Sequence, residues 1–150
     1  MAPHSASQSA TKLYTPRLLS LSAELANFPL SGSFDHSAEA RSRTCGSTIE
    51  LGVDLDDARN VSRLGMQVTA CAVGQSSAAV MAMAAKGRSG DDFTQMHSAL
   101  DAWLSGRGEL PDWPGIDALV PALPHNGRHG AILLPWIAMV DALSSASSNG

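Results

Sequence analysis

The side chains best suited to bind a metal or accept sulfur are two cysteines, Cys45 and Cys71, and the histidine His129. Thiolate sulfur and neutral imidazole are soft or borderline ligands, the kind found in zinc sites and iron–sulfur sites. Three such ligands suit a zinc ion with an open fourth position. They also suit part of an iron–sulfur site, which ordinarily has four protein ligands. The chemistry that these residues predict is therefore metal or cluster binding.

Cys71 is predicted at a junction between a strand and a helix. The alternation of apolar residues over 64–70 predicts the strand, and the segment 73–86 predicts a helix that Gly87 ends. By strict alternation Cys71 points away from the apolar face of that strand. Free N–H groups at the start of the next helix favour its thiolate form. A buried, inert cysteine is equally compatible with the pattern, because free cysteine is among the most buried residue types.

Cys45 and His129 are each predicted at the edge of an element. Cys45 stands beside Gly46 in a turn, where glycine lets backbone N–H groups approach a cluster or an anion closely. His129 comes just before the last predicted helix, whose N-terminus disfavours the imidazolium and keeps the neutral, ligating form. A purely structural role stays open for both residues, and the other histidines are expected to be solvated or hydrogen-bonded.

The first half of the chain predicts a helix followed by a sheet. Apolar residues over 14–28, at alternating spacings of four and three, predict a helix that Thr15 caps. The segment 38–44 predicts an edge strand, and strict alternation over 48–55 and again over 64–70 predicts two further strands. Such an antiparallel sheet has one solvent-exposed face, so helices must cover the other face.

The second half is predicted to be helical. Helices are expected over 73–86 and 89–104, a short helix is expected from Pro114, and a last helix is expected over 132–143. Pro135 sets the start of that last helix, because only the first four N–H groups of a helix lack partners. The predicted fold class is α+β, with a short three-stranded antiparallel sheet covered by an N-terminal helix and a helical C-terminal half.

Length and composition predict a single domain over 11–144, between a flexible N-terminal tail at 1–10 and a flexible C-terminal tail at 145–150. With a net charge of −4 and 16% charged residues, the sequence does not predict a basic surface that would bind nucleic acid or an anionic membrane. The longest apolar run, 131–140, is shorter than the roughly 20 residues that span a bilayer. The N-terminal tail lacks the apolar core of a secretory signal, which predicts a cytoplasmic protein whose cysteines stay reduced.

The order of elements and the contexts of both cysteines resemble the IscU/NifU N-terminal family of iron–sulfur cluster assembly scaffolds. The resemblance covers nearly the whole chain, from about Leu13 to Leu143. Four stretches are similar to family motifs: Leu13-Tyr14 at the start of the first helix, Thr44-Cys45-Gly46 before a strand, Ala70-Cys71-Ala72 running into Ser76-Ser77-Ala78-Ala79, and Lys86-Gly87-Arg88-Ser89 after the following helix.

The resemblance implies a scaffold or carrier rather than an enzyme. It implies that the protein accepts sulfur from a cysteine desulfurase, binds iron, and passes a 2Fe–2S cluster to apo iron–sulfur proteins. It also places Cys45, Cys71 and His129 together at one end of the molecule. One branch of the family has a cysteine directly after the histidine, where this chain has Gly130. The family has an aspartate two residues after its first cysteine, where this chain has Ser47, a weaker candidate metal ligand.

Two further stretches bear on partners. Leu123-Pro124 is a reduced form of the Leu-Pro-Pro-Val-Lys stretch that Hsp70-type chaperones recognise in one branch, so chaperone docking is not predicted. The loop over 105–127 resembles the insertion of the SufU-like branch, whose members pair with a cysteine desulfurase. Two alternatives stay open: a zinc-binding, non-catalytic interaction protein derived from the scaffold family, and a hydrolase with Cys71 as nucleophile and His129 as its base.

Overall fold

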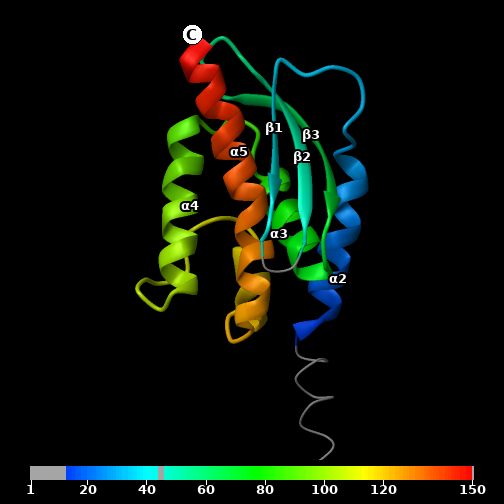
Figure 1. Ribbon diagram of the computed structural model, residues 1–150, viewed down its shortest axis with the longest axis vertical. Helices are drawn as coiled ribbons and strands as arrows, with labels where there is room; N and C mark the ends of the chain where they lie inside the picture. The colour runs from blue at the N-terminus through cyan, green and yellow to red at the C-terminus, as the bar shows by residue number, and fades with distance from the viewer. Residues whose placement is uncertain (1–12, 44–45, 150) are drawn as a thin grey trace, which may run out of the picture.

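A three-stranded antiparallel sheet, with helices packed behind it and along its side, forms the molecule in the computed structural model (Figure 1). The structure describes residues 13–43 and 46–149, so Cys45 lies outside the described residues. This architecture confirms the predicted α+β class. The elements, with η for a 3-10 helix, are α2 (Pro16–Ala23), η1 (Glu24–Asn27), β1 (His36–Arg41), β2 (Thr48–Leu55), β3 (Val61–Thr69), α3 (Ala72–Met83), α4 (Gly90–Leu104), η2 (Ile116–Ala122), η3 (Asn126–Arg128) and α5 (His129–Asn149).

The strands follow one another in the order β1-β2-β3, and the sheet buries one face. Ile49, Leu51 and Val53 of the central strand are almost fully buried, as their alternation predicts. The edge strand β1 lies at 36–41 rather than at the predicted 38–44. Just after its end the N–H of Ser42 donates to the carbonyl of Ser47, 2.8 Å away, across the turn that leads into β2.

Part of the outer face of the sheet is covered by Phe34, from the segment that leads into β1. Gly52 faces Gly65 across β2 and β3, and a Cβ atom at Gly65 would lie 2.8 Å from the Phe34 ring. The glycine pair therefore makes room for the aromatic ring. The guanidinium of Arg63 lies 4.0 Å from the centre of that ring and also binds Asp54 at 2.8 Å.

The helix α3 is the buried centre of the helical layer. Its two serines are fully buried, and each donates to a carbonyl of a neighbouring segment: Ser76 to Leu18 and Ser77 to Ile132, the latter at 2.7 Å. The indole N–H of Trp136 donates in turn to Ser77 Oγ at 3.0 Å. Small side chains thus let α2 and α5 approach α3, and the two serine hydroxyls and the indole N–H all have hydrogen-bond partners.

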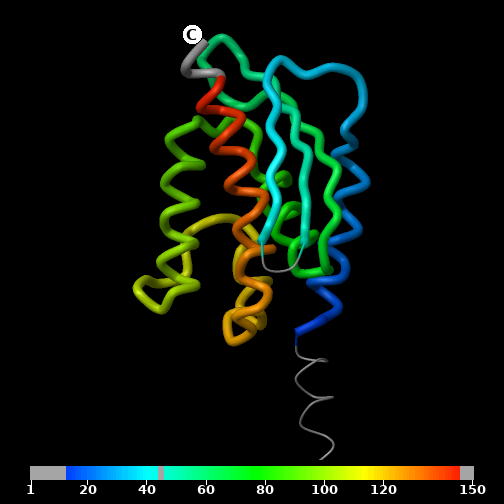
Figure 2. The backbone as a smooth tube through the Cα atoms, viewed as in Figure 1, coloured from blue at the N-terminus to red at the C-terminus, as the bar shows by residue number. Residues whose placement is uncertain are grey.

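The helix α5 begins at His129 rather than at the predicted 132, and it continues through Asn149 instead of ending near 143. Pro135 therefore lies inside the helix, where it cannot supply an N–H to the preceding turn. The Ser77 hydroxyl donates to the carbonyl of Ile132 in that turn, so a neighbouring helix supplies a donor close to the break. Figure 2 shows α5 running beside α4 and past the lower ends of β1 and β2, with which it is in contact.

The predicted start of α4 is confirmed by a capping box. Ser89 Oγ accepts from the N–H of Asp92, and the Asp92 carboxylate accepts from the N–H of Ser89. Thr15 caps α2 as predicted, since its hydroxyl accepts from the N–H of Leu18 at 3.1 Å. In the described part of the chain, every helix is too short or too polar to span a bilayer.

Candidate functional site

Cys71 is the N-cap residue of α3, two positions after the end of β3. Its backbone is extended, and its side chain makes no capping hydrogen bond to the helix. The residue is half-buried against the hydrophobic core and carries a free thiol. The strand-to-helix junction predicted for Cys71 is therefore present. The thiol therefore stands at the start of α3 without a hydrogen bond to the helix.

His129 is the first residue of α5 and is also half-buried. Its Nε2 lies 2.7 Å from the carbonyl oxygen of Leu123. A carbonyl oxygen only accepts hydrogen bonds, so Nε2 carries the proton. In the neutral ring the lone pair is then on Nδ1. Histidine ligands of metals commonly donate their other ring N–H to a backbone carbonyl in this way.

Gly74 brings the starts of α3 and α5 together. A Cβ atom built on Gly74 would lie 3.1 Å from the Cβ of Ala131, in the first turn of α5. It would also lie 2.9 Å from the Cβ of Ala70. The absence of a side chain at Gly74 therefore lets the helix that begins at His129 pack directly on the helix that Cys71 caps.

The turn between β1 and β2 lies at the same end of the sheet. Thr48 pairs with Arg41 of β1 and with Thr69 of β3, which puts the start of β2 beside the strand end that leads to Cys71. Cys45 and Thr44, in this turn, lie outside the described residues, so the position of the Cys45 thiol stays a prediction. Ser47 is in the described part of the turn and is only 4% exposed.

Among residues 13–43 and 46–149, no group of three or more His, Cys, Asp or Glu side chains is arranged to hold a metal ion. Cys71 and His129 stand at two helix starts that Gly74 holds together, and the third predicted ligand, Cys45, lies outside the described residues. The predicted ligand set is two thiols and one imidazole, and the structure describes one residue of each kind, Cys71 and His129.

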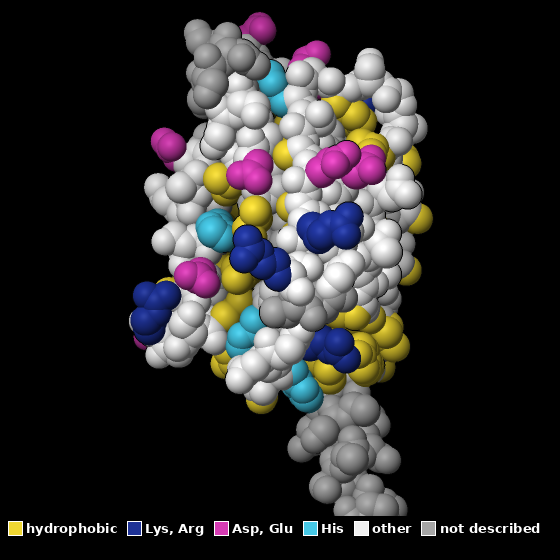
Figure 3. Space-filling view, in the orientation of Figure 1, with side chains coloured by type: hydrophobic (Ala, Val, Ile, Leu, Met, Phe, Trp, Pro, Cys, Tyr) yellow, Lys and Arg dark blue, Asp and Glu magenta, His cyan; other side chains and the backbone are white. Residues whose placement is uncertain are grey.

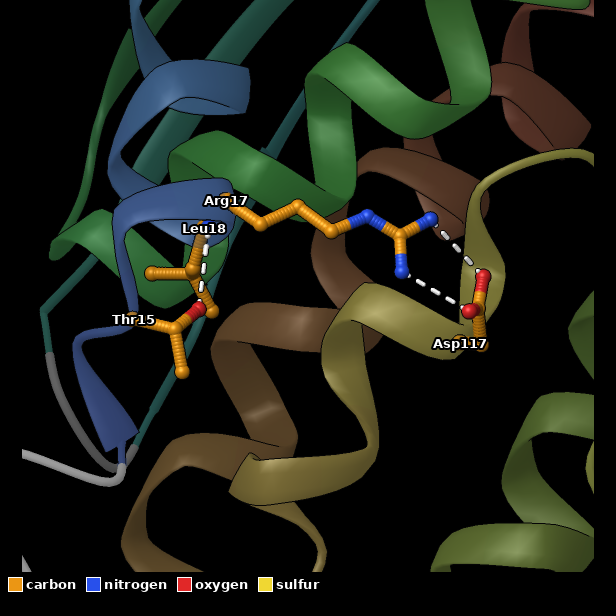
Figure 4. A network of polar contacts seen from close by, with 4 residues as sticks. All are labelled: Thr15, Arg17, Leu18 and Asp117. Carbon is orange, nitrogen blue, oxygen red and sulfur yellow. Dashed lines mark hydrogen bonds and ion pairs between the residues drawn. The ribbon is translucent and has the colours of Figure 1, made fainter.

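Two polar contacts near this end could not be found from the sequence. The guanidinium of Arg128 donates to the hydroxyl of Tyr14 at 3.1 Å, and Arg17 binds Asp117 through two bonds of 2.7 and 2.9 Å (Figure 4). Hydrogen bonding from Arg17 holds the pKa of the Asp117 carboxyl below its usual value. Each contact joins residues about a hundred positions apart, and no spacing in a single sequence pairs them.

The outer face of the sheet next to this end is polar and shallowly hollowed. A hollow of about 350 Å³ is lined by Glu39, Glu50, Gln67 and neighbouring residues of the strands. Glu39 and Glu50 are direct cross-strand partners. Figure 3 shows acidic side chains gathered over the middle of the sheet, with basic side chains below them. This half of the outer face is the part that Phe34 does not cover.

The fold and the two described donors define a class of protein, a small α+β domain that presents cysteine and histidine where one end of a sheet meets two helix starts. No protein-family model matches the sequence, and no curated protein matches it either. Solved structures do match. A nitrogen-fixing NifU-like protein (N-terminal) from Brucella abortus is 25% identical, with a TM-score of 0.85 over 95% of this chain and 99% of that one.

A second solved structure is an iron–sulfur cluster assembly scaffold protein for the SUF system from the thermophile Fervidobacterium islandicum AW-1. It is 20% identical, with a TM-score of 0.76 over 87% of this chain and 96% of that one. A hypothetical protein shares the fold at 19% identity, with a TM-score of 0.62 over 83% of this chain and 96% of that one. The chain is IscU/NifU-like, and the family resemblance predicted from its motifs is confirmed.

Proposed function

We propose that the protein is a scaffold or carrier for iron–sulfur clusters, with Cys45, Cys71 and His129 as the protein ligands of the cluster. The cluster is cargo, assembled on the protein and passed to apo iron–sulfur proteins. The observation that carries the proposal is the contact of Gly74 with Ala131, which brings the helix starts at Cys71 and His129 together. The likeness to a NifU-like protein and to a SUF scaffold supports the same role.

The two thiols would also accept sulfur from a cysteine desulfurase. In that step a cysteine thiolate of this chain attacks the outer sulfur of the persulfide on the desulfurase. The sulfur–sulfur bond of the donor breaks, a new one forms on the accepting cysteine, and the desulfurase cysteine leaves as its thiolate. Cys71 suits this step because it carries a free thiol at the N-cap position of α3, where that thiol makes no hydrogen bond to the helix. A reducing compartment such as the cytoplasm would keep both thiols available.

His129 would bind iron through Nδ1, because Nε2 is occupied by the carbonyl of Leu123. Gly130, the next residue, supplies no side-chain ligand. Ser47 is a predicted donor but is almost fully buried in its turn. The fourth ligand is therefore proposed to come from outside the chain, as a small thiol, a water molecule or a residue of a second subunit. A cluster held by three protein ligands is expected to leave more readily than one held by four.

Anaerobic reconstitution with iron and sulfide tests the proposal. The wild-type protein should develop visible charge-transfer absorption and retain iron after desalting. Cys71→Ser and His129→Ala should lose most of both signals, while His97→Ala, a histidine change on α4, should keep them. If the wild-type protein shows no such absorption and retains no iron, the scaffold role is wrong.

The same donor set favours one alternative, a zinc-bound interaction protein, because two thiolates and one imidazole also suit zinc with an open fourth position. Metal analysis separates the two functions. Zinc recovered in stoichiometric amount, loss of helicity on chelation and no uptake of a cluster would support the zinc-bound protein, since a structural metal contributes folding energy outright.

A further inference from the structure

The segment that carries His129 is held at both ends by the start of the N-terminal helix. At one end, Arg17 of α2 binds Asp117 of η2 with two hydrogen bonds (Figure 4). At the other end, Arg128 of η3 donates to the hydroxyl of Tyr14, the residue before the N-cap of α2. Residues 14–17 therefore contact the η2–η3 segment at two points that lie 11 residues apart in the sequence, at 117 and 128.

Between these two points the segment closes on itself. Leu123 follows the end of η2, and its carbonyl oxygen accepts the Nε2 proton of His129. The N–H of Arg128 donates to the carbonyl of His125 at 2.9 Å, which forms the turn that delivers His129 to the start of α5. The orientation of the His129 ring thus depends on where Leu123 and Arg128 are held. Within the described residues, η3 is hydrogen-bonded to the N-terminal segment through the Arg128–Tyr14 contact.

The tip of η3, at Gly127, is open to solvent on its Cβ side. A Cβ atom built at this position would have no atom within 4 Å, so the backbone there faces open space. Asn126 and Gly127 are both exposed, whereas Arg128 and Tyr14 are half-buried. The contact between the guanidinium and the phenol hydroxyl therefore lies on the half-buried side of η3, away from its exposed tip.

We propose that Tyr14 and Arg128 are positioning residues for His129. Their contact fixes the turn so that Nε2 donates to Leu123 and Nδ1 is left to bind the cargo. The inference rests on the proposed function, in which His129 is a ligand. It adds that the N-terminal segment, distant in sequence from all three ligands, determines the orientation of the imidazole.

The first readout needs no metal. In the metal-free protein at about pH 8, where free histidine is neutral, nitrogen-15 NMR of the wild type should show the Nε2–H form for His129. Tyr14→Phe removes only the accepting hydroxyl, and Arg128→Met removes the donor at similar side-chain length. Both should shift His129 toward a mixture of the two neutral forms. Arg128→Lys keeps a donor and should retain the wild-type form.

The second readout is a titration with Co²⁺, followed by its visible absorption. Tyr14→Phe and Arg128→Met should each bind Co²⁺ about ten-fold more weakly, the scale on which residues behind a metal ligand act. Arg107→Gln is the matched control, because it removes an exposed arginine whose ion pair, with Asp101, involves neither Tyr14 nor the η2–η3 segment. Circular dichroism should show equal helicity in all variants.

An unchanged His129 signal in both Tyr14→Phe and Arg128→Met would overturn the inference, as would Co²⁺ affinities equal to that of Arg107→Gln. If the wild-type protein binds no Co²⁺ and no cluster, the proposed function fails, while the NMR readout still decides whether Tyr14 and Arg128 position His129.

Discussion

A Cβ atom built on Gly74 would lie 3.1 Å from the Cβ of Ala131, closer than nine in ten real Cβ contacts. This approach joins the first turns of α3 and α5, which Cys71 and His129 begin. The spacing of the helix starts at Cys71 and His129 therefore depends on one residue without a side chain.

Gly74→Ala is expected to push the two helix starts apart. Overpacking of this kind costs about 1–3 kcal/mol, and the gain of about 1 kcal/mol in helix propensity offsets only part of it. Urea unfolding should show a net loss of stability, and Co²⁺ affinity should fall as well. Gly127→Ala is the control, since its Cβ would meet no atom within 4 Å. Equal stability and equal affinity in the two variants would show that the Gly74 contact does not hold the site.

Gly130→Cys tests whether the site lacks one ligand. A thiol directly after His129 would raise the protein ligands from three to four, so reconstituted clusters should absorb more strongly and resist chelators longer. Loss of the cluster should slow on the order of ten-fold, the scale on which even outer groups change metal affinity. Gly130→Ser adds a side chain of similar size with a weaker donor and should resemble the wild type. Identical cluster loss in Cys and Ser variants would contradict the three-ligand interpretation.

Alternation and helix signals predicted the sheet, the capped starts of α2 and α4, and the junction at Cys71, because each depends on neighbouring residues. The start of α5 was predicted too late, at 132 instead of His129. The prediction placed Pro135 in the first turn of the helix, because proline has no N–H to donate. That rule uses only neighbouring residues, and it takes no account of the Ser77 hydroxyl of α3, which donates to the carbonyl of Ile132. For the site, the presence of cysteine and histidine suggested the candidate metal ligands. Their proximity depends on Gly74, whose significance appears only when α5 is packed against it.

Ser77→Ala should destabilise the protein by about 1–3 kcal/mol, because it leaves two buried polar groups without their partner. The Trp136 indole would lose its acceptor, and the Ile132 carbonyl would lose its donor. Urea unfolding followed by tryptophan fluorescence measures the loss. Ser20→Ala, on the exposed face of α2, should change stability by less than about 0.5 kcal/mol. A similar small effect for Ser77→Ala would mean that water replaces the hydroxyl.

Asp54→Asn should lower stability in a pH-dependent way. The pKa of Asp54 is lowered, first by the hydrogen bond from the N–H of Asp35 and also by Arg63. A lowered pKa means that the stabilisation is present above the pKa of the unfolded chain and is lost as pH falls through the folded value. The difference from wild type should be about 1 kcal/mol at neutral pH and should shrink below about pH 4.

Thermal unfolding of the wild type and of Asp54→Asn across this pH range checks the expectation. Asp57→Asn, in the exposed turn after β2, is the charge-matched control and should show little effect at any pH. A constant difference between Asp54→Asn and wild type from neutral pH to pH 3 would rule out ionisation of Asp54 as its cause.

The ring of Phe34 divides the outer surface of the sheet into two unlike halves. One half is sealed by an aromatic side chain, and the other, at the end that carries the donors, is an open polar hollow lined by Glu39, Glu50 and Gln67. Permanent assemblies bury mostly apolar surface, whereas short-lived encounters use polar surface. The open half therefore suits short-lived contacts, which is what the proposed scaffold function requires of a protein that meets a sulfur donor and then a recipient in succession.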